Sequence, residues 1–251
     1  MTKAKKKQKR SGKRIVMDLI VTLIVLAMLG TAAYLLYQEF FPNNVPVLKL
    51  QAQTDDGFSW DKLRAINSDT IGWLRIDDTT IDTPVVQTTD NDKYLKTAFD
   101  GSSDERGTPF LDKDYHWTEP KSQNSVIYGH SVFNASSGIK VMFDDLHNYV
   151  TDPNYYSSHA TIEYDRPPEL GGNGKWQIFA VIEVEATVDY RQPDFADEES
   201  FVAYYQKLQE ASLIKTDVQV NPGDEILTLS TCTEESIFQD GRLAVIAKRV
   251  S

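Results

Sequence analysis

The chain has 251 residues, one cysteine and a formal net charge of −11 from 37 acidic and 26 basic residues. Eight of the basic residues lie within the first 14 positions, so the rest of the chain holds 18 Lys and Arg (26 − 8) against all 37 Asp and Glu. An acidic body of this kind repels nucleic acid, which argues against a DNA- or RNA-binding protein. The single cysteine excludes a disulfide within the chain.

The N-terminus is basic and then apolar. Residues 1–14 contain no acid, and residues 15–37 are apolar apart from Asp18. An apolar run of roughly 20 residues is long enough to cross a bilayer, so we expect a basic cytoplasmic tail over 1–14 and a single-pass signal anchor over 15–37. The remainder is then extracytoplasmic, at the cell membrane. A cleaved signal peptide is the alternative, because residues 31–33 resemble a cleavage site. The apolar run continues through residue 37, which favours the uncleaved anchor.

Residues 38–57 contain two prolines and paired asparagines, which predicts a linker before one domain over residues 58–251. The spacing of Phe58, Trp60, Leu63 and Ile66 predicts a short helix at the start of this domain.

The rest of the domain is rich in short β-type runs. They lie at residues 71–76, 83–88, 125–130, 161–165, 175–188, 226–232 and 243–250. Seven short strands with irregular connections predict a mainly β fold, either a closed barrel or a sandwich. Helices are expected at 140–149 and 197–209, and the aromatic stripe of the second is expected to pack against the strands. The glycines of residues 171–174 predict a hairpin turn.

The single cysteine lies at the end of a predicted strand. Alternation along residues 226–232 puts Thr228, Ser230 and Cys232 on one face. If this strand and the next form an antiparallel hairpin across residues 233–241, Cys232 and Arg242 face each other at its open rim. A guanidinium beside a thiol can activate it or stabilise an oxyanion.

A cysteine nucleophile usually works with a histidine. His116, His147 and His159 lie in a loop, a predicted helix and a turn, where surface or packing roles are expected. His130 closes the predicted strand 125–130 directly after Gly129. Glycine allows close backbone approach there, so the imidazole is expected to lie over the rim.

These residues resemble a known family. The motif TLSTC at 228–232, Arg242 ten positions later, YGH at 128–130 and the basic-then-apolar N-terminus are similar to sortases, membrane-anchored cysteine transpeptidases of Gram-positive bacteria. The segments 67–77, 88–95 and 142–146, and the expected helix near 197–211, resemble class B. The resemblance implies an eight-stranded β-barrel with an N-terminal helix and a long helix inserted before the penultimate strand. One departure is that the stretch between His130 and Met142 is longer than the family pattern.

The resemblance also implies roles for individual residues. Cys232 would attack the carbonyl after the threonine of an NPQTN-like C-terminal sorting signal and form a thioester. His130 would protonate the leaving amine, and Arg242 would hold substrate or stabilise the oxyanion. An amine of a cell-wall precursor would then accept the surface protein. Substrate contacts are expected from Ser230, Thr231, Asn91, Tyr94 and Glu234, and neither a metal nor another cofactor is expected.

Three alternatives remain open from the sequence. A pilus-polymerising sortase would use a pilin lysine as acceptor, and a hydrolytic cysteine peptidase would release free acid. A membrane-tethered binding module would leave Cys232 silent.

Overall fold

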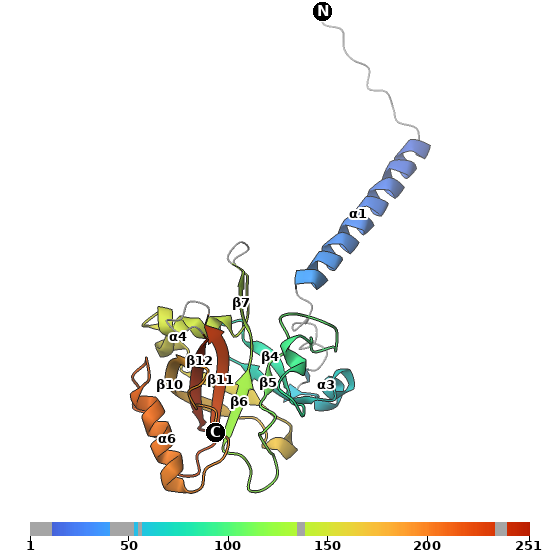
Figure 1. Cartoon of the computed structure of the whole chain (residues 1–251). Coiled ribbons are helices and arrows are strands. Elements are labelled where there is room, and N and C mark those ends of the chain that lie inside the picture. Colours follow the sequence, from blue (N-terminus) through green and yellow to red (C-terminus); the bar gives the residue numbers. More distant parts are fainter. Residues whose placement is uncertain (1–11, 41–52, 55–56, 135–138, 234–239) are drawn as a thin grey trace, which may run out of the picture. The chain divides into compact units, whose positions relative to one another are not determined.

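The computed structural model describes residues 12–40, 53–54, 57–134, 139–233 and 240–251 (Figure 1). The chain divides into two compact units, Met1–Asn44 and Val45–Ser251, which are described separately.

The first unit contains one helix, α1 (Gly12–Phe40). Large apolar side chains are exposed along it, among them Leu19, Leu23, Leu26 and Leu29. In the part of the chain that the structure describes, no helix has both the length and the apolar character needed to cross a membrane. The predicted transmembrane helix over residues 15–37 is therefore not shown, although a helix does cover these residues. Most of the predicted basic tail lies outside the described residues.

The second unit is built on a closed barrel of eight strands in the order β10-β12-β11-β6-β5-β4-β3-β9. The strands are β3 (Thr70–Arg75), β4 (Asp82–Val86), β5 (Phe110–Leu111), β6 (Asn124–Tyr128), β9 (Thr161–Asp165), β10 (Lys175–Glu185), β11 (Ile226–Thr233) and β12 (Gly241–Arg249). Seven were predicted from the sequence, and the barrel rather than the sandwich is confirmed. The two-residue strand β5 was missed. Closure leaves no unpaired sheet edge.

Period-two alternation divides the side chains of β11 and β12 between two cores. Leu227, Leu229 and Val245 belong to the larger core cluster, together with Trp176 and Ile178 of β10. The alternate positions Ile226, Ala244 and Ile246 belong to a second cluster, which contains the apolar face of α6 (Glu198–Glu210). Both faces of this hairpin are therefore packed along most of its length, and its register is fixed.

The helix α6 lies beside β10 and β12 and precedes the penultimate strand, as expected (Figure 1). Asp197 caps it: its side chain accepts the Ser200 N–H, and the Ser200 hydroxyl is paired with the Asp197 backbone. Phe201, Tyr205 and Leu208 are buried against the barrel. The predicted packing role of the aromatic stripe is confirmed.

The predicted helix at 140–149 is wrong in its first turn. These residues belong to the strand β8 (Ile139–Met142), which pairs with β7 (Ser131–Asn134) in a two-stranded antiparallel sheet. Helical turns follow only in η2 (Asp144–His147) and α4 (Asn148–Thr151), with α5 (Tyr155–Ser158) after them. The positive φ of Met142, 56°, ends the strand, and Asp144 accepts a hydrogen bond from the Ser131 hydroxyl across the sheet. Pairing with the preceding strand overrides the local helical pattern.

The start of the domain holds the predicted short helix as α3 (Trp60–Ile66). Before it, β1 (Gln53–Thr54) pairs with β2 (Gly57–Phe58). Most of the predicted linker lies outside the described residues, and its described parts belong to α1 and to this pair of strands. The remaining short helices are η1 (Lys93–Leu95) and η3 (Pro168–Leu170). The connection between the antiparallel strands β9 and β10 contains η3 followed by residues 171–174, where the turn was predicted.

Candidate active site

The β11–β12 pairing sets Cys232 beside Arg242. The two residues are direct cross-strand partners in the antiparallel register. Cys232 is a free, exposed thiol. Nη1 of Arg242 donates to Oδ1 of Asp240 at 2.5 Å and to the Gly241 carbonyl at 2.9 Å. The predicted juxtaposition is therefore present, and the guanidinium is held at the rim by its own strand end.

His130 reaches the same rim from the other side of β11. The strand β6 runs parallel to β11 with Tyr128 opposite Ser230, and the Gly129 N–H donates to the Ser230 carbonyl at 3.1 Å. A Cβ on Gly129 would lie 2.8 Å from the buried ring of Phe143, so only glycine fits there. The Phe143 N–H in turn donates to the His130 carbonyl at 3.0 Å. The backbone around His130 is thus fixed from two sides.

The three residues line one groove of about 380 Å³, a volume within the usual range for ligand sites. Its walls come from residues 91–92, 94–95, 108 and 110, 128–130, 191, 230–232 and 242. The long loop between β4 and β5 forms one wall. Its Leu95 carbonyl lies 2.9 Å from Nε2 of His130.

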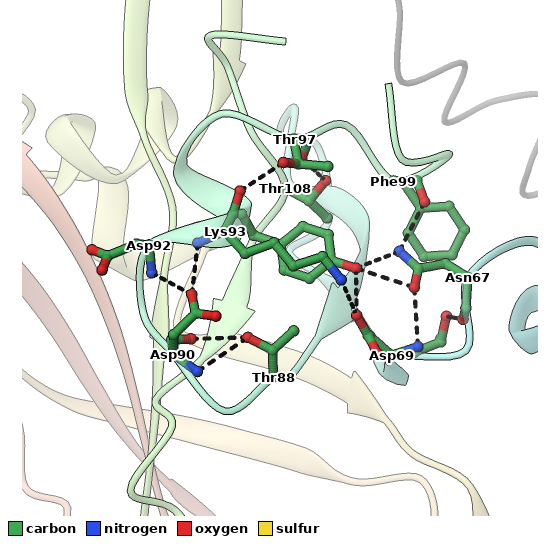
Figure 2. Close-up of polar contacts among 11 residues, drawn as sticks. Asn67, Asp69, Thr88, Asp90, Asp92, Lys93, Thr97, Phe99 and Thr108 are labelled. Atoms are coloured by element: carbon green, nitrogen blue, oxygen red, sulfur yellow. Dashed lines mark hydrogen bonds and ion pairs between the residues drawn. The ribbon is translucent and has the colours of Figure 1, made fainter. Parts of the chain in front are cut away.

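Side chains within this loop hold η1 in place (Figure 2). Oδ1 of Asp90 accepts the N–H groups of Asp92 and Lys93 at 2.8 and 2.7 Å, which satisfies donors at the start of the helical turn. These two hydrogen bonds favour the charged carboxylate and lower the pKa of Asp90. Oδ2 of Asp69, between α3 and β3, accepts from Nζ of Lys93 at 2.7 Å and from the Tyr94 hydroxyl at 2.9 Å. The loop is therefore tied to the barrel.

The comparisons with known proteins agree with this geometry. The model of the sortase domain family matches residues 74–250. The chain belongs to the sortase family.

Its relatives place this sortase in class B. Sortase B of Listeria monocytogenes is 35% identical over 190 residues, which cover 75% of this chain and 73% of that protein. A structure described as a Staphylococcus aureus sortase B–substrate complex has a TM-score of 0.70 at 26% identity and covers 89% of this chain and 99% of that one. A sortase B from B. anthracis in complex with AAEK1 has a TM-score of 0.70 at 28% identity, over 86% and 99%. The predicted identity as a class B sortase, a cysteine transpeptidase, is confirmed, and the alternatives are not favoured.

The predicted substrate contacts of this sortase have different surroundings. Ser230 lines the groove but is buried, and its hydroxyl lies 2.8 Å from the Tyr190 hydroxyl. Thr231 is buried beside it, and its Oγ1 has no hydrogen-bond partner among the described residues. Asn91 lines the groove, and its amide accepts from the Lys113 N–H and donates to Asp112.

Tyr94 lines the groove but is buried, and its hydroxyl is engaged with Asn67 and Asp69. Glu234 lies outside the described residues. Of the four histidines, all of them described, His130 alone lines the groove of the sortase, while His116 lies near Asp194 and the ring of His159 stacks on Tyr155.

Three groups in the sortase groove or behind it were not singled out from the sequence. The Tyr128 hydroxyl donates to Asp112 at 2.6 Å, and burial, followed by this hydrogen bond, raises the pKa of Tyr128. Arg191 also lines the groove, with its guanidinium 5.5 Å from the centre of the Tyr190 ring. Tyr128 belongs to the YGH motif and could have been found from it. Asp112 and Arg191 lie in segments without a periodic pattern.

The described part of the sortase contains no group of three or more His, Cys, Asp or Glu residues that could hold a metal ion.

Proposed function

We propose that Cys232, His130 and Arg242 are the catalytic residues of this sortase. The observation that carries the proposal is their convergence on one groove, with Cys232 and Arg242 as cross-strand partners. An exposed thiol on a fixed strand, with a cation and an imidazole beside it, has the components of covalent acyl transfer.

The first half-reaction breaks a peptide bond. The Cys232 thiol passes its proton to His130, and its sulfur attacks the carbonyl carbon of the threonine in the sorting signal, so that the carbonyl oxygen becomes an oxyanion. Arg242 stabilises that charge. The C–N bond then breaks, His130 gives its proton to the leaving amine, and the acyl group remains on sulfur as a thioester.

The second half-reaction restores the enzyme. An amine attacks the thioester carbon and loses a proton to His130, which passes it to the departing Cys232 sulfur. The product is a new amide between the substrate protein and the acceptor. Water competes with the amine at this stage, so a groove that limits water favours transfer over hydrolysis.

For the donor substrate, we propose an NPQTN-like sorting signal bound in the groove. Asn91, Tyr94, Ser230, Thr231 and Glu234 are the proposed contacts. The likeness to a Staphylococcus aureus sortase B–substrate complex supports a peptide substrate for the same groove. The proposed acceptor is an amine of a cell-wall precursor, with a pilin lysine as the second candidate.

For the location, we propose an extracytoplasmic catalytic unit attached to the cell membrane through the N-terminal segment. Support comes from the basic residues at 1–14 and from the exposed apolar side chains of α1. Protease treatment of protoplasts should digest residues 45–251. An alkaline wash then separates integral insertion, in which the chain stays with the membrane, from surface attachment. Recovery of the intact chain in the cytosolic fraction contradicts the proposal.

The decisive experiment follows the acyl group. The full chain and its Cys232→Ala variant are incubated with NPQTN-type or LPXTG-type peptides and triglycine, and products are identified by mass spectrometry. We expect a thioester adduct and an amine-ligated product that both require Cys232. Free acid as the only product at saturating triglycine would indicate another acceptor or a peptidase. The absence of any adduct with either peptide would refute the catalytic roles.

A further inference from the structure

The ring of His130 is oriented by a backbone group. Its Nε2 lies 2.9 Å from the Leu95 carbonyl. A carbonyl oxygen only accepts hydrogen bonds, so this contact requires a proton on Nε2. In the neutral ring the other nitrogen, Nδ1, is then the unprotonated one. The position of one carbonyl therefore selects both the rotation and the tautomer of the imidazole.

Two features hold the backbone around that carbonyl. The Thr108 N–H donates to the Tyr94 carbonyl at 3.0 Å. Gly107 passes so close that a Cβ there would lie 2.1 Å from the Tyr94 oxygen and 2.9 Å from the Leu95 oxygen, and its φ is +64°. Residues 107–108 therefore closely confine the turn that carries Leu95.

Asp69 holds the same turn from the barrel side (Figure 2). Its Oδ2 receives Nζ of Lys93 at 2.7 Å and the hydroxyl of Tyr94 at 2.9 Å, so one carboxylate oxygen binds the two residues directly before Leu95. The Asp69 backbone is fixed in turn, because its N–H donates to Asn67 and its carbonyl accepts the Gln87 N–H.

We propose that Asp69 is a positioning residue for His130, acting through Lys93 and Tyr94 on the Leu95 carbonyl. This inference rests on the proposed acid–base role of His130 and deepens it. Asp69 does not line the groove and contacts no reacting atom. Its effect is to keep Nε2 protonated and Nδ1 available in the resting enzyme, in an orientation fixed relative to Cys232.

The first test uses the full chain with Asp69→Ala. Small displacements of a catalytic group cost up to about 100-fold in rate, and we expect roughly a 10-fold loss of kcat with KM for the sorting peptide little changed. Asp69→Asn keeps one acceptor oxygen and should give an intermediate loss. Asp100→Ala is the matched control, because Asp100 lies on the same loop and its carboxylate binds only Ser102 among the described residues. It should keep the wild-type kcat.

The second measurement does not depend on turnover. Side-chain ¹⁵N shifts of His130 in the resting enzyme report which nitrogen carries the proton. The wild type and Asp100→Ala should show protonated Nε2, and Asp69→Ala should show a mixture of tautomers. Gly107→Ala would place a Cβ 2.9 Å from the Leu95 oxygen and should move the signals in the same direction, which covers the case in which Asp69→Ala does not fold.

Each outcome has one meaning. Folded Asp69→Ala with wild-type kcat and wild-type ¹⁵N shifts overturns the proposal. A rise in KM alone also overturns it, because the loop would then serve substrate binding through Asn91 and Tyr94. If the wild type forms no thioester, the proposed function fails, while the ¹⁵N comparison still tests the Asp69 contact.

Discussion

The two ends of the β11–β12 pair differ in how far their charged residues are paired and buried. At one end, Glu225, next to β11, faces Arg249, whose N–H donates to the Glu225 carbonyl at 2.9 Å. At the other end, Cys232 faces Arg242. The two positions are only seven residues apart along the chain, so the same register fixes both.

The Glu225 end is a closed ion cluster. Oε1 of Glu225 accepts from Lys121 at 2.6 Å, and Oε2 accepts from Arg166 at 3.2 Å and Arg249 at 3.3 Å. The side chain of Arg166 is fully buried. Burial raises the pKa of Glu225, but the hydrogen bonds and charges of Lys121 and Arg166 outweigh it and bring the pKa to about 2. The ion cluster at this end therefore stabilises the folded state.

The Cys232 end is open. The thiol is exposed, and among the described residues Arg242 is held only by exposed Asp240 and the adjacent Gly241 carbonyl. Exposed ion pairs are weak and are easily exchanged for a substrate group. The comparison teaches that one end fixes the strands, so that the other can present reactive groups with few internal partners.

The largest expected effect is that of Cys232→Ala, which should abolish activity and leave stability unchanged. Removing the nucleophile should lower the rate of transpeptidation by at least about 1,000-fold, since a triad knockout in a well-studied protease costs still more. Because the side chain is exposed, the free energy of unfolding should change by less than about 0.5 kcal/mol. Peptide ligation assays and urea unfolding measure the two. Activity above a tenth of the wild-type rate would refute the assignment.

Glu225→Gln should have the converse effect, lowering stability and leaving activity unchanged. Loss of the carboxylate leaves buried Arg166 without a counter-charge, which should destabilise the fold by about 2–4 kcal/mol. The groove residues are untouched, so kcat/KM per folded molecule should stay at the wild-type value. Urea unfolding and ligation kinetics below the unfolding midpoint check both statements.

A surface pair provides the control for Glu225. Glu105 pairs with Lys96 at 3.2 Å, and both side chains are more than two-thirds exposed. Glu105→Gln should leave the unfolding midpoint unchanged. Equal destabilisation by the two substitutions would mean that the buried cluster has no special role.

The same cluster predicts how stability depends on pH. The folded-state pKa of Glu225, about 2, lies below its ordinary value of 4.5, so the carboxylate stabilises the fold fully above pH 4.5. The contribution is lost as the pH falls from 4.5 toward 2. After allowance for solvent screening of the half-buried group, about 1–2 kcal/mol should be lost between pH 6 and pH 3. Urea unfolding of wild type and Glu225→Gln at both pH values isolates the contribution of Glu225. Equal losses of unfolding free energy in the two proteins would contradict the prediction.

Local patterns in the sequence were enough for most of the barrel and for the open rim. Alternation fixed which side of β11 carries Cys232, and it put Arg242 opposite once an antiparallel hairpin was assumed. The helix α6 was predictable because its cap at Asp197 and its aromatic stripe are both local.

What could not be predicted depends on contacts between segments, which no single local pattern shows. The strand β8 exists because residues 131–134 pair with it, and β5 is only two residues long. The contact between His130 and Leu95 uses a backbone carbonyl, which any residue could supply. Tyr94 was predicted as a substrate contact, but the hydrogen bond from its hydroxyl to Asp69, 25 positions away, has no signal in the sequence.

The smallest expected effect lies at the open end itself, with Asp240→Asn. Asp240 is 70% exposed and holds the Arg242 guanidinium by one hydrogen bond of 2.5 Å. Asparagine keeps an acceptor oxygen at this place but removes the competing negative charge. An exposed ion pair contributes about 0–1 kcal/mol, so KM for the sorting peptide should fall by no more than about three-fold, with kcat unchanged. The difference should shrink at high salt, because screening weakens the wild-type pair as well. Ligation kinetics at 0.05 and 1 M NaCl test this, and a loss of kcat would instead make Asp240 part of the arrangement that holds Arg242 for catalysis.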